Sequence, residues 1–260
     1  MREAEMVESV SLLQPRFVNP ATNPMIDEVL RANLAVKRAN AVELLHAAVE
    51  EFGKVGGEVT FANSFGAEDM VLTDLILKEG LPIEIFSLDT GRLPAETYTL
   101  IGEVEQHYGT RLKVFFPESG AVEQYVRTHG INAFYDSVEL RKACCAVRKV
   151  EPLRRALAGK KAWITGMRAA QSATRTDLPT RQFDEGNGLE KYNPLADWSE
   201  KEVWAYIRIH GVPYNALHDQ FYPSIGCAPC TRAITIGEDI RAGRWWWENP
   251  DSKECGLHKK

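Results

Sequence analysis

The feature of this sequence that most restricts its fold is the alternation of short apolar segments with longer helical segments. Segments of four to six residues rich in β-branched and aromatic residues are each followed by a segment with helical spacing of its apolar residues. This order is typical of a parallel sheet with right-handed helical crossovers, so we expect the α/β class. The expected strands are residues 58–62, 83–88, 112–116 and 162–165, and the expected helices are residues 27–52, 68–78, 94–108, 120–129, 147–158 and 199–210.

Two long segments do not follow this alternation. Residues 168–192 are rich in threonine, glycine and charge, which predicts a functional loop. Residues 248–260 contain few apolar side chains, which predicts a flexible C-terminal tail. We therefore expect an N-terminal extension of residues 1–25, an α/β domain of residues 26–247 and a tail of residues 248–260.

The formal charge of −5 on this 260-residue chain is unevenly distributed. Residues 141–175 hold ten bases and one acid, a net +9, so the other 225 residues carry −14. The basic segment predicts either a solvated helix face or a local site for a small anion. The acidic remainder argues against a nucleic-acid surface. No apolar run approaches the ~20 residues that span a membrane, and the N-terminus has acids where a signal peptide has bases. We expect a cytoplasmic protein with no membrane contact.

Three polar loops follow expected strands, at residues 63–69, 89–92 and 166–168. In open parallel sheets, ligands bind beyond the carboxyl ends of the strands, and a following helix offers free amide groups to a phosphate. Together the loops predict a nucleotide site, although the large Phe65 argues against a compact phosphate cradle in the first one. The candidate substrate-binding residues are Ser64, Gly66, Asp89, Thr90, Gly91, Gly166 and Arg168, with Arg175 as a further cation.

Four of the five cysteines form two pairs separated by 81 residues, Cys144-Cys145 and Cys227-Ala228-Pro229-Cys230. Four thiolates match the ligand count of a structural zinc ion or of a 4Fe-4S cluster. Neighbouring side chains diverge, which favours a polynuclear target over zinc. A thioredoxin-like redox motif and unconnected buried cysteines are the other interpretations.

The fifth cysteine, Cys255, lies in the expected tail beside His258, Lys259 and Lys260, which favour its thiolate form. A thiolate on a hinged tail can reach a bound substrate and then a second protein. Upstream, Arg241 and Arg244 are expected one helical turn apart and could grip an anion together.

These residues together resemble the assimilatory adenylyl-sulfate (APS) reductases of the PAPS reductase family. The matching segments run from about residue 60 to the C-terminus. They are SFGAEDMVL, LDTGRLPAETY, the Cys144-Cys145 pair with Arg148-Lys149, ITGMR, CAPCTR, RAGRWWW and the terminal ECGLH.

The resemblance implies a Rossmann-like parallel sheet of the adenine-nucleotide α-hydrolase type, with a mobile catalytic tail. It implies one 4Fe-4S cluster on the four paired cysteines and a nucleophilic Cys255. The substrate would be adenosine 5′-phosphosulfate, the products AMP and sulfite, and the electron donor thioredoxin. Lys149, Arg241, Arg244 and His258 are the candidate groups around the reacting anion, with Arg168 or Arg175 assisting.

Three alternatives remain open at the level of sequence. A reductase of the 3′-phosphorylated nucleotide, PAPS, would use the same scaffold. A tRNA thiolase would need ATP cleavage, against which the SFGAED loop and the acidic remainder argue. An iron–sulfur redox sensor would not need Cys255. The sequence is compatible with a homo-oligomer but does not determine one.

Overall fold

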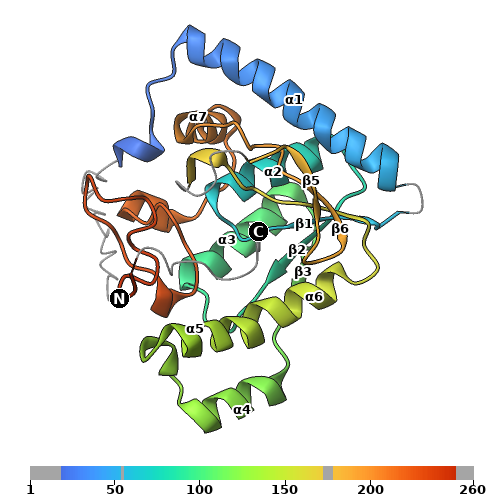
Figure 1. Ribbon diagram of the computed structural model, residues 1–260. Helices are drawn as coiled ribbons and strands as arrows, with labels where there is room; N and C mark the ends of the chain where they lie inside the picture. The colour runs from blue at the N-terminus through green and yellow to red at the C-terminus, as the bar shows by residue number, and fades with distance from the viewer. Residues whose placement is uncertain (1–18, 54–55, 172–177, 250–260) are drawn as a thin grey trace, which may run out of the picture.

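The structure is a computed structural model that describes residues 19–53, 56–171 and 178–249. Its centre is a six-stranded sheet with the strand order β3-β2-β1-β4-β6-β5 (Figure 1). Neighbouring strands are parallel except for β5, which runs antiparallel to β6. The strands are β1 (Val59–Ala62), β2 (Glu84–Leu88), β3 (Lys113–Phe115), β4 (Ala162–Ile164), β5 (Arg181–Asp184) and β6 (Leu189–Tyr192).

The helices cover both faces of this sheet. One apolar core joins α1, α2, α3 and α7 to strand residues such as Phe61, Ile85 and Ile164. A smaller core places α6 against the opposite face, on Phe86 and Trp163 (Figure 1). The helices are α1 (Glu28–Phe52), α2 (Ala67–Lys78), α3 (Ala95–Tyr108), α4 (Ser119–His129), α5 (Val138–Cys145), α6 (Glu151–Leu157) and α7 (Glu200–His210).

Local capping signals fix several helix ends where the sequence places them. The Asp27 side chain accepts a hydrogen bond from the Leu30 amide at the start of α1. Ser199 and Glu202 form a reciprocal capping box at α7, and that helix ends at Gly211 in the left-handed conformation. These helix ends agree with the sequence. The α/β prediction is also confirmed, because the four strands that the sequence predicted, β1 to β4, are all parallel to their neighbours.

The prediction of a loop over residues 168–192 is wrong in its second half. Residues 181–192 contain the β5–β6 hairpin, and β6 extends the parallel sheet beside β4. β5 lies at the sheet edge and is mostly polar, whereas β6 is an interior strand that is mostly buried yet carries the charged residues Glu190 and Lys191. An apolar alternation was therefore too weak to predict them.

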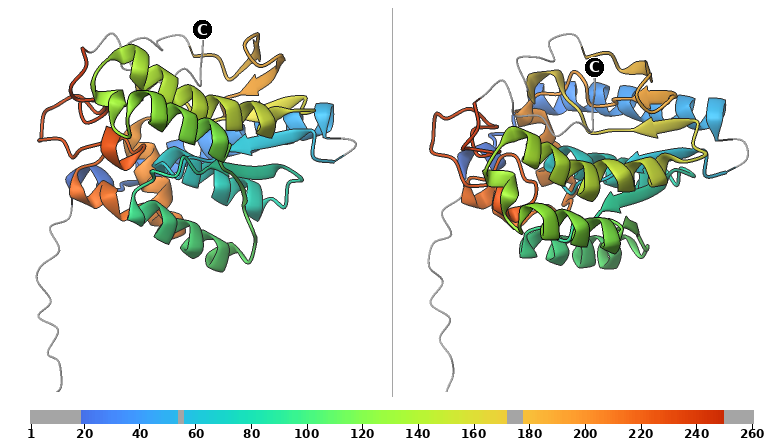
Figure 2. Two further views of the ribbon diagram at one scale, coloured as in Figure 1. Left: turned by 90° about the horizontal axis from the view of Figure 1, so that it is seen from below. Right: turned by 60° about the horizontal axis from the view of Figure 1, so that its bottom comes forward.

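The expected helix over residues 147–158 is also wrong in its extent. It is the end of a continuous rod made of α5, a π-helical turn (Ala146–Val150) and α6 (Figure 1, Figure 2). Pro152 has no amide N–H, so it cannot donate to the carbonyl four residues earlier, and the ladder is interrupted there. The rod matters for function because it carries both Cys144-Cys145 and Lys149.

Within the described ranges, no helix has both the length and the apolar character required to cross a bilayer.

Candidate active site

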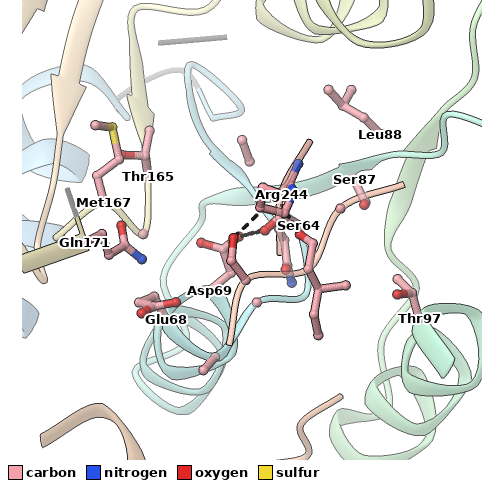
Figure 3. A pocket seen from close by; sticks show the side chains of 18 of the residues that line it. Ser64, Glu68, Asp69, Ser87, Leu88, Thr97, Thr165, Met167, Gln171 and Arg244 are labelled. Carbon is pink, nitrogen blue, oxygen red and sulfur yellow. Dashed lines mark hydrogen bonds between the residues drawn. The ribbon is translucent and has the colours of Figure 1, made fainter. Parts of the chain in front are cut away.

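A cavity of about 270 Å³ lies beyond the carboxyl ends of β1, β2 and β4. Thr165, Met167 and Gln171 lie on one side of it, and Ser87 and Thr97 on the other (Figure 3). The C-terminal segment from Pro223 to Trp245 completes the wall. The structure brings the following sequence candidates to this cavity: Ser64, Gly66, Thr90, Lys149, Gly166, Arg168, Arg241 and Arg244.

The loop after β1 is tied to the first turn of α2. The Asp69 carboxylate accepts hydrogen bonds from the Ser64 amide and from the Ser64 hydroxyl, both at 2.6 Å (Figure 3). Burial raises the pKa of Asp69 to about 6, and the Ser64 bonds only partly oppose this rise. Gly66 is the N-cap of α2 and supplies no side-chain acceptor, so the first amide groups of the helix can serve an anion.

Phe65 does not fill this loop as its size led us to expect. Its φ of 62° is in the left-handed region, and its ring is 1% exposed within the main core. The side chain therefore packs into the core and is not among the residues that line the cavity.

The turn after β2 divides the predicted residues into two groups. Asp89 accepts hydrogen bonds from the Gly91 amide at 2.7 Å and from the Tyr98 hydroxyl at 2.9 Å. Asp89 and Gly91 do not line the cavity, so within the described residues they shape the turn. Thr90 does line it, and its Oγ1 lies 3.2 Å from Sγ of Cys227.

The loop after β4 contributes a close backbone approach and a buried cation. A side chain at Gly166 would collide with the carboxylate of Asp69. The Arg168 guanidinium is 3% exposed, pairs with Glu68 at 2.7 Å and donates to the Trp198 carbonyl. Because Glu68 compensates its charge, Arg168 anchors the wall more than it attracts an anion.

Arg241 and Arg244 lie in a turn rather than in the expected helix. The Arg244 amide donates to the Arg241 carbonyl, and Arg244 forms an isolated β-bridge with Thr231. Arg244 is 8% exposed, and its guanidinium stacks on Trp245 at 4.6 Å. A side chain at Gly226 would collide with this guanidinium. Gly226 is thus a packing requirement that sequence reasoning missed.

A second, smaller cavity of about 20 Å³ adjoins the first and is lined by all four paired cysteines. Cys144 and Cys145 end α5, and Cys227 and Cys230 are the N-cap and the last residue of a 3-10 turn (Ala228–Cys230). Lys149, Arg244 and Trp245 line both cavities. The fold therefore joins two cysteine pairs that are 81 residues apart, and places a lysine and an arginine between them and the larger cavity.

Cations surround these thiols. Burial raises the pKa of Cys227, but Lys149, the Thr90 hydrogen bond, Arg244 and Arg148 outweigh it and the net shift is downward. Burial and the neighbouring Cys227 raise the pKa of Cys230 to about 12.

The four thiols line one small cavity, and cationic side chains lie around them. Ionised thiolates carry negative charge that such cations offset, so the arrangement fits a polynuclear thiolate-ligated group. Although the four cysteines line this one cavity, among the described side chains no three Cys, His, Asp or Glu residues are already grouped as a metal ion would require.

Three predicted residues, Arg175, Cys255 and His258, lie outside the described residues. Several residues of the larger cavity were missed by sequence reasoning, because nothing local distinguishes them. They are Thr97, Glu200, Trp204 and His218, whereas Asn63 and Glu68 lie in the loop of residues 63–69 that the sequence did predict.

Comparisons with known proteins identify the family of this chain. Residues 58–233 match the family described as phosphoadenosine phosphosulfate reductase domain. An adenosine 5′-phosphosulfate reductase of Allochromatium vinosum is 63% identical over 227 residues, 87% of each chain. One from Burkholderia cepacia is 57% identical over 86% of this chain and 90% of its own. A crystal structure of phosphoadenylyl-sulfate reductase from Candida auris, a phosphate complex, has a TM-score of 0.63 at 30% identity and covers 80% and 98% of the two chains.

Proposed function

The chain belongs to the phosphoadenosine phosphosulfate reductase family, and from that premise we propose that it reduces adenosine 5′-phosphosulfate to sulfite and AMP in sulfate assimilation. Relatives that carry the name adenosine 5′-phosphosulfate reductase are 49–63% identical over most of the chain. The single observation that carries the proposal is the wall shared by the two cavities. Lys149 and Arg244 lie between a nucleotide-sized cavity at the strand ends and the four cysteines.

The four cysteines are proposed to hold one 4Fe-4S cluster. The support is their convergence on one small cavity, and the positive charge of Arg92, Arg148 and Lys149 around it. When bound, such a cluster would supply a fixed charge centre and order the segment from Cys144 to Lys149. A reducing compartment, the cytoplasm, suits a chain whose cysteines serve as ligands and nucleophile.

Within the cavity, the division of polar groups suits a phosphosulfate. The amide groups at the start of α2 and the Ser64 loop can bind the nucleotide phosphate. Lys149, Arg241 and Arg244 can neutralise negative oxygens that would otherwise repel an approaching thiolate. The same cations stabilise the charge that develops on the leaving AMP.

The nucleophile is proposed to be Cys255, on the tail of residues 248–260, with His258 beside it. The Cys255 thiolate attacks the sulfonate sulfur, an S–S bond forms, and the S–O bond breaks with its electron pair leaving on AMP. A thiolate of reduced thioredoxin then attacks Sγ of Cys255, and sulfite departs with the electrons of the S–S bond. The second thioredoxin thiol then attacks the thioredoxin sulfur of the resulting mixed disulfide, which breaks its bond to Cys255, releases the Cys255 thiolate and closes the thioredoxin disulfide. The two electrons taken by the substrate sulfur therefore come from thioredoxin.

Anaerobically purified protein, reduced thioredoxin and adenosine 5′-phosphosulfate test the proposal directly. We expect equal amounts of sulfite and AMP, and a Cys255 adduct of the mass of sulfonate when thioredoxin is omitted. Visible spectra with iron, zinc and acid-labile sulfide analysis test the cluster. Zinc without sulfide would remove the cluster from the proposal.

The second candidate is reduction of the 3′-phosphorylated nucleotide, which the name of the Candida auris structure suggests. Steady-state kinetics with both nucleotides decide between them. A kcat/KM for the 3′-phosphorylated substrate equal to or above that for adenosine 5′-phosphosulfate would reverse our choice.

A further inference from the structure

His218 is a buried histidine in the wall of the larger cavity to which neither the sequence motifs nor the proposed chemistry gives a task. It lies in the 3-10 helix η6 (Ala216–Gln220) and is 3% exposed. By the geometric criteria for a hydrogen bond, neither ring nitrogen has a partner among the described residues, although the Tyr222 main chain lies near enough to raise the pKa of the ring. A buried polar group without a partner costs free energy, so one that lines a ligand cavity points to a bond made with the ligand.

The position of the imidazole is closely determined by its surroundings. The Asn19 side-chain amide donates to the His218 carbonyl at 2.9 Å. Asn215, the N-cap of η6, accepts from the Leu217 amide and donates to Thr97. The His218 ring packs edge-to-face against Trp204 with centroids 5.1 Å apart. A ring held in this way can present a nitrogen to a ligand without losing much side-chain freedom on binding.

The chemistry around His218 suits an uncharged partner. Burial lowers the pKa of His218, and Glu68, the Tyr222 main chain and Asp219 only partly oppose this, so the imidazole is neutral near pH 7. Glu68 pairs with Arg168, and the half-buried Glu200 interacts with the same guanidinium in this part of the wall. The cations suited to phosphate and sulfonate, Lys149 and Arg241, belong to other elements of the wall.

We propose that His218 binds the nucleotide by a hydrogen bond between its neutral imidazole and an uncharged group of the adenosine part, a hydroxyl or a ring nitrogen. This inference rests on the proposed nucleotide substrate. It makes His218 a substrate-binding residue that adds affinity without contributing charge to the reacting anion.

The test measures equilibrium binding of AMP and of adenosine to the full chain by calorimetry, in His218→Gln and His218→Met. Glutamine and methionine have similar length and shape, but only glutamine can make the hydrogen bond. His210→Met serves as the matched control, because His210 packs on Tyr206 outside the cavity. Thermal unfolding and near-ultraviolet circular dichroism verify that each variant folds.

We expect His218→Met to weaken AMP and adenosine alike, by roughly three- to ten-fold, the effect of one net hydrogen bond. His218→Gln should stay within about two-fold of the natural protein, as should His210→Met. Unchanged affinities in His218→Met would overturn the proposal, and so would a loss of affinity for AMP but not for adenosine. If His218→Met fails to fold, His218→Leu, another side chain without a hydrogen-bonding group, replaces it, with the same expected loss and the same overturning result.

Neither ligand is turned over in these measurements, so they are independent of the proposed reaction. If the protein does not reduce adenosine 5′-phosphosulfate but binds AMP and adenosine through His218, the proposed function is wrong and this inference stands. If the protein reduces the substrate but His218→Met leaves binding unchanged, the proposed function stands and this inference is wrong.

Discussion

Arg141 and Glu248 form a buried ion pair with two hydrogen bonds, 2.8 Å from Nε to Oε1 and 2.6 Å from Nη2 to Oε2. Their side chains are 0% and 3% exposed, and the guanidinium stacks on Trp245 at 4.6 Å. The pair joins α5, which ends in Cys144-Cys145, to the segment that leads into the tail. It explains why one of the ten bases of the basic segment is buried rather than available to an anion.

Breaking this pair should be costly. Glu248→Gln leaves the Arg141 charge buried and incompletely compensated, so we expect the free energy of unfolding to fall by about 3–5 kcal/mol. Glu151→Gln, which breaks the exposed pair with Arg155 on α6, is the control and should cost under about 1 kcal/mol. Urea denaturation of both variants provides the comparison, and equal losses would contradict the assigned role of burial.

The two kinds of cysteine should separate by function. Cys255→Ser should abolish sulfite formation, because the nucleophile is lost, while iron content and visible absorption persist. Cys227→Ser should lose iron and visible absorption, because one of the four ligands is gone. Metal analysis, spectra and sulfite assays on both variants check this. Loss of iron from Cys255→Ser would contradict the division into four ligands and one nucleophile.

Lys149 should contribute to the rate. Lys149→Ala removes a cation that lines both cavities, so we expect kcat to fall on the order of 100-fold, as for other charge-stabilising donors. Lys142→Ala, an exposed lysine two turns earlier on the same rod, is the control and should change kcat less than about two-fold. Equal rates in the two variants would argue against a place for Lys149 beside the reacting anion.

Asp69 should make stability depend on pH in an unusual direction. Its folded pKa of about 6 lies above the ordinary value of 3.8, so the unfolded chain ionises first as pH rises. The contribution of Asp69 is therefore fully present below about pH 4 and is lost as pH rises through 6, a change of about 3 kcal/mol.

Asp69→Asn removes this titration while keeping an oxygen that accepts from Ser64. Relative to the variant, the natural protein should lose stability between pH 4 and pH 7. Urea denaturation of both proteins across that range measures the difference. A gap that stays constant with pH would show that burial does not raise the pKa of Asp69.

Gly166 should tolerate no side chain. Gly166→Ala drives a Cβ into the Asp69 carboxylate, so we expect a loss of about 1–3 kcal/mol in stability and weaker AMP binding. Gly102→Ala in α3 is the matched control, because no atom lies within 4 Å of the added Cβ. There the gain in helix propensity should leave stability equal or slightly higher, by up to about 1 kcal/mol. Thermal unfolding and AMP calorimetry compare the two.

The sequence predicted the elements whose signals are local. The caps at Asp27 and Ser199 and the glycine at residue 211 lie within one turn of the helix ends that they set. The polar β5–β6 hairpin and the start of α5 at Val138 were missed, because four-residue strands with charged residues and short helices carry little periodicity. Asp89 and Gly91 were expected to bind the ligand because their loop follows a strand at the predicted binding edge. In the structure the Gly91 amide donates to the Asp89 carboxylate, so both residues serve the turn itself.

By itself, the sequence determined the βα order, and with it the sheet edge at which the loops collect. It also supplied two cysteine pairs and a basic segment. Only the tertiary structure decided which of these residues meet. Thr90 touches Cys227 across 137 residues, Arg141 pairs with Glu248 across 107, and His218 reaches the cavity without any motif around it. Local signals arise from backbone geometry within a few residues, whereas these contacts depend on how whole elements pack, which no short segment encodes.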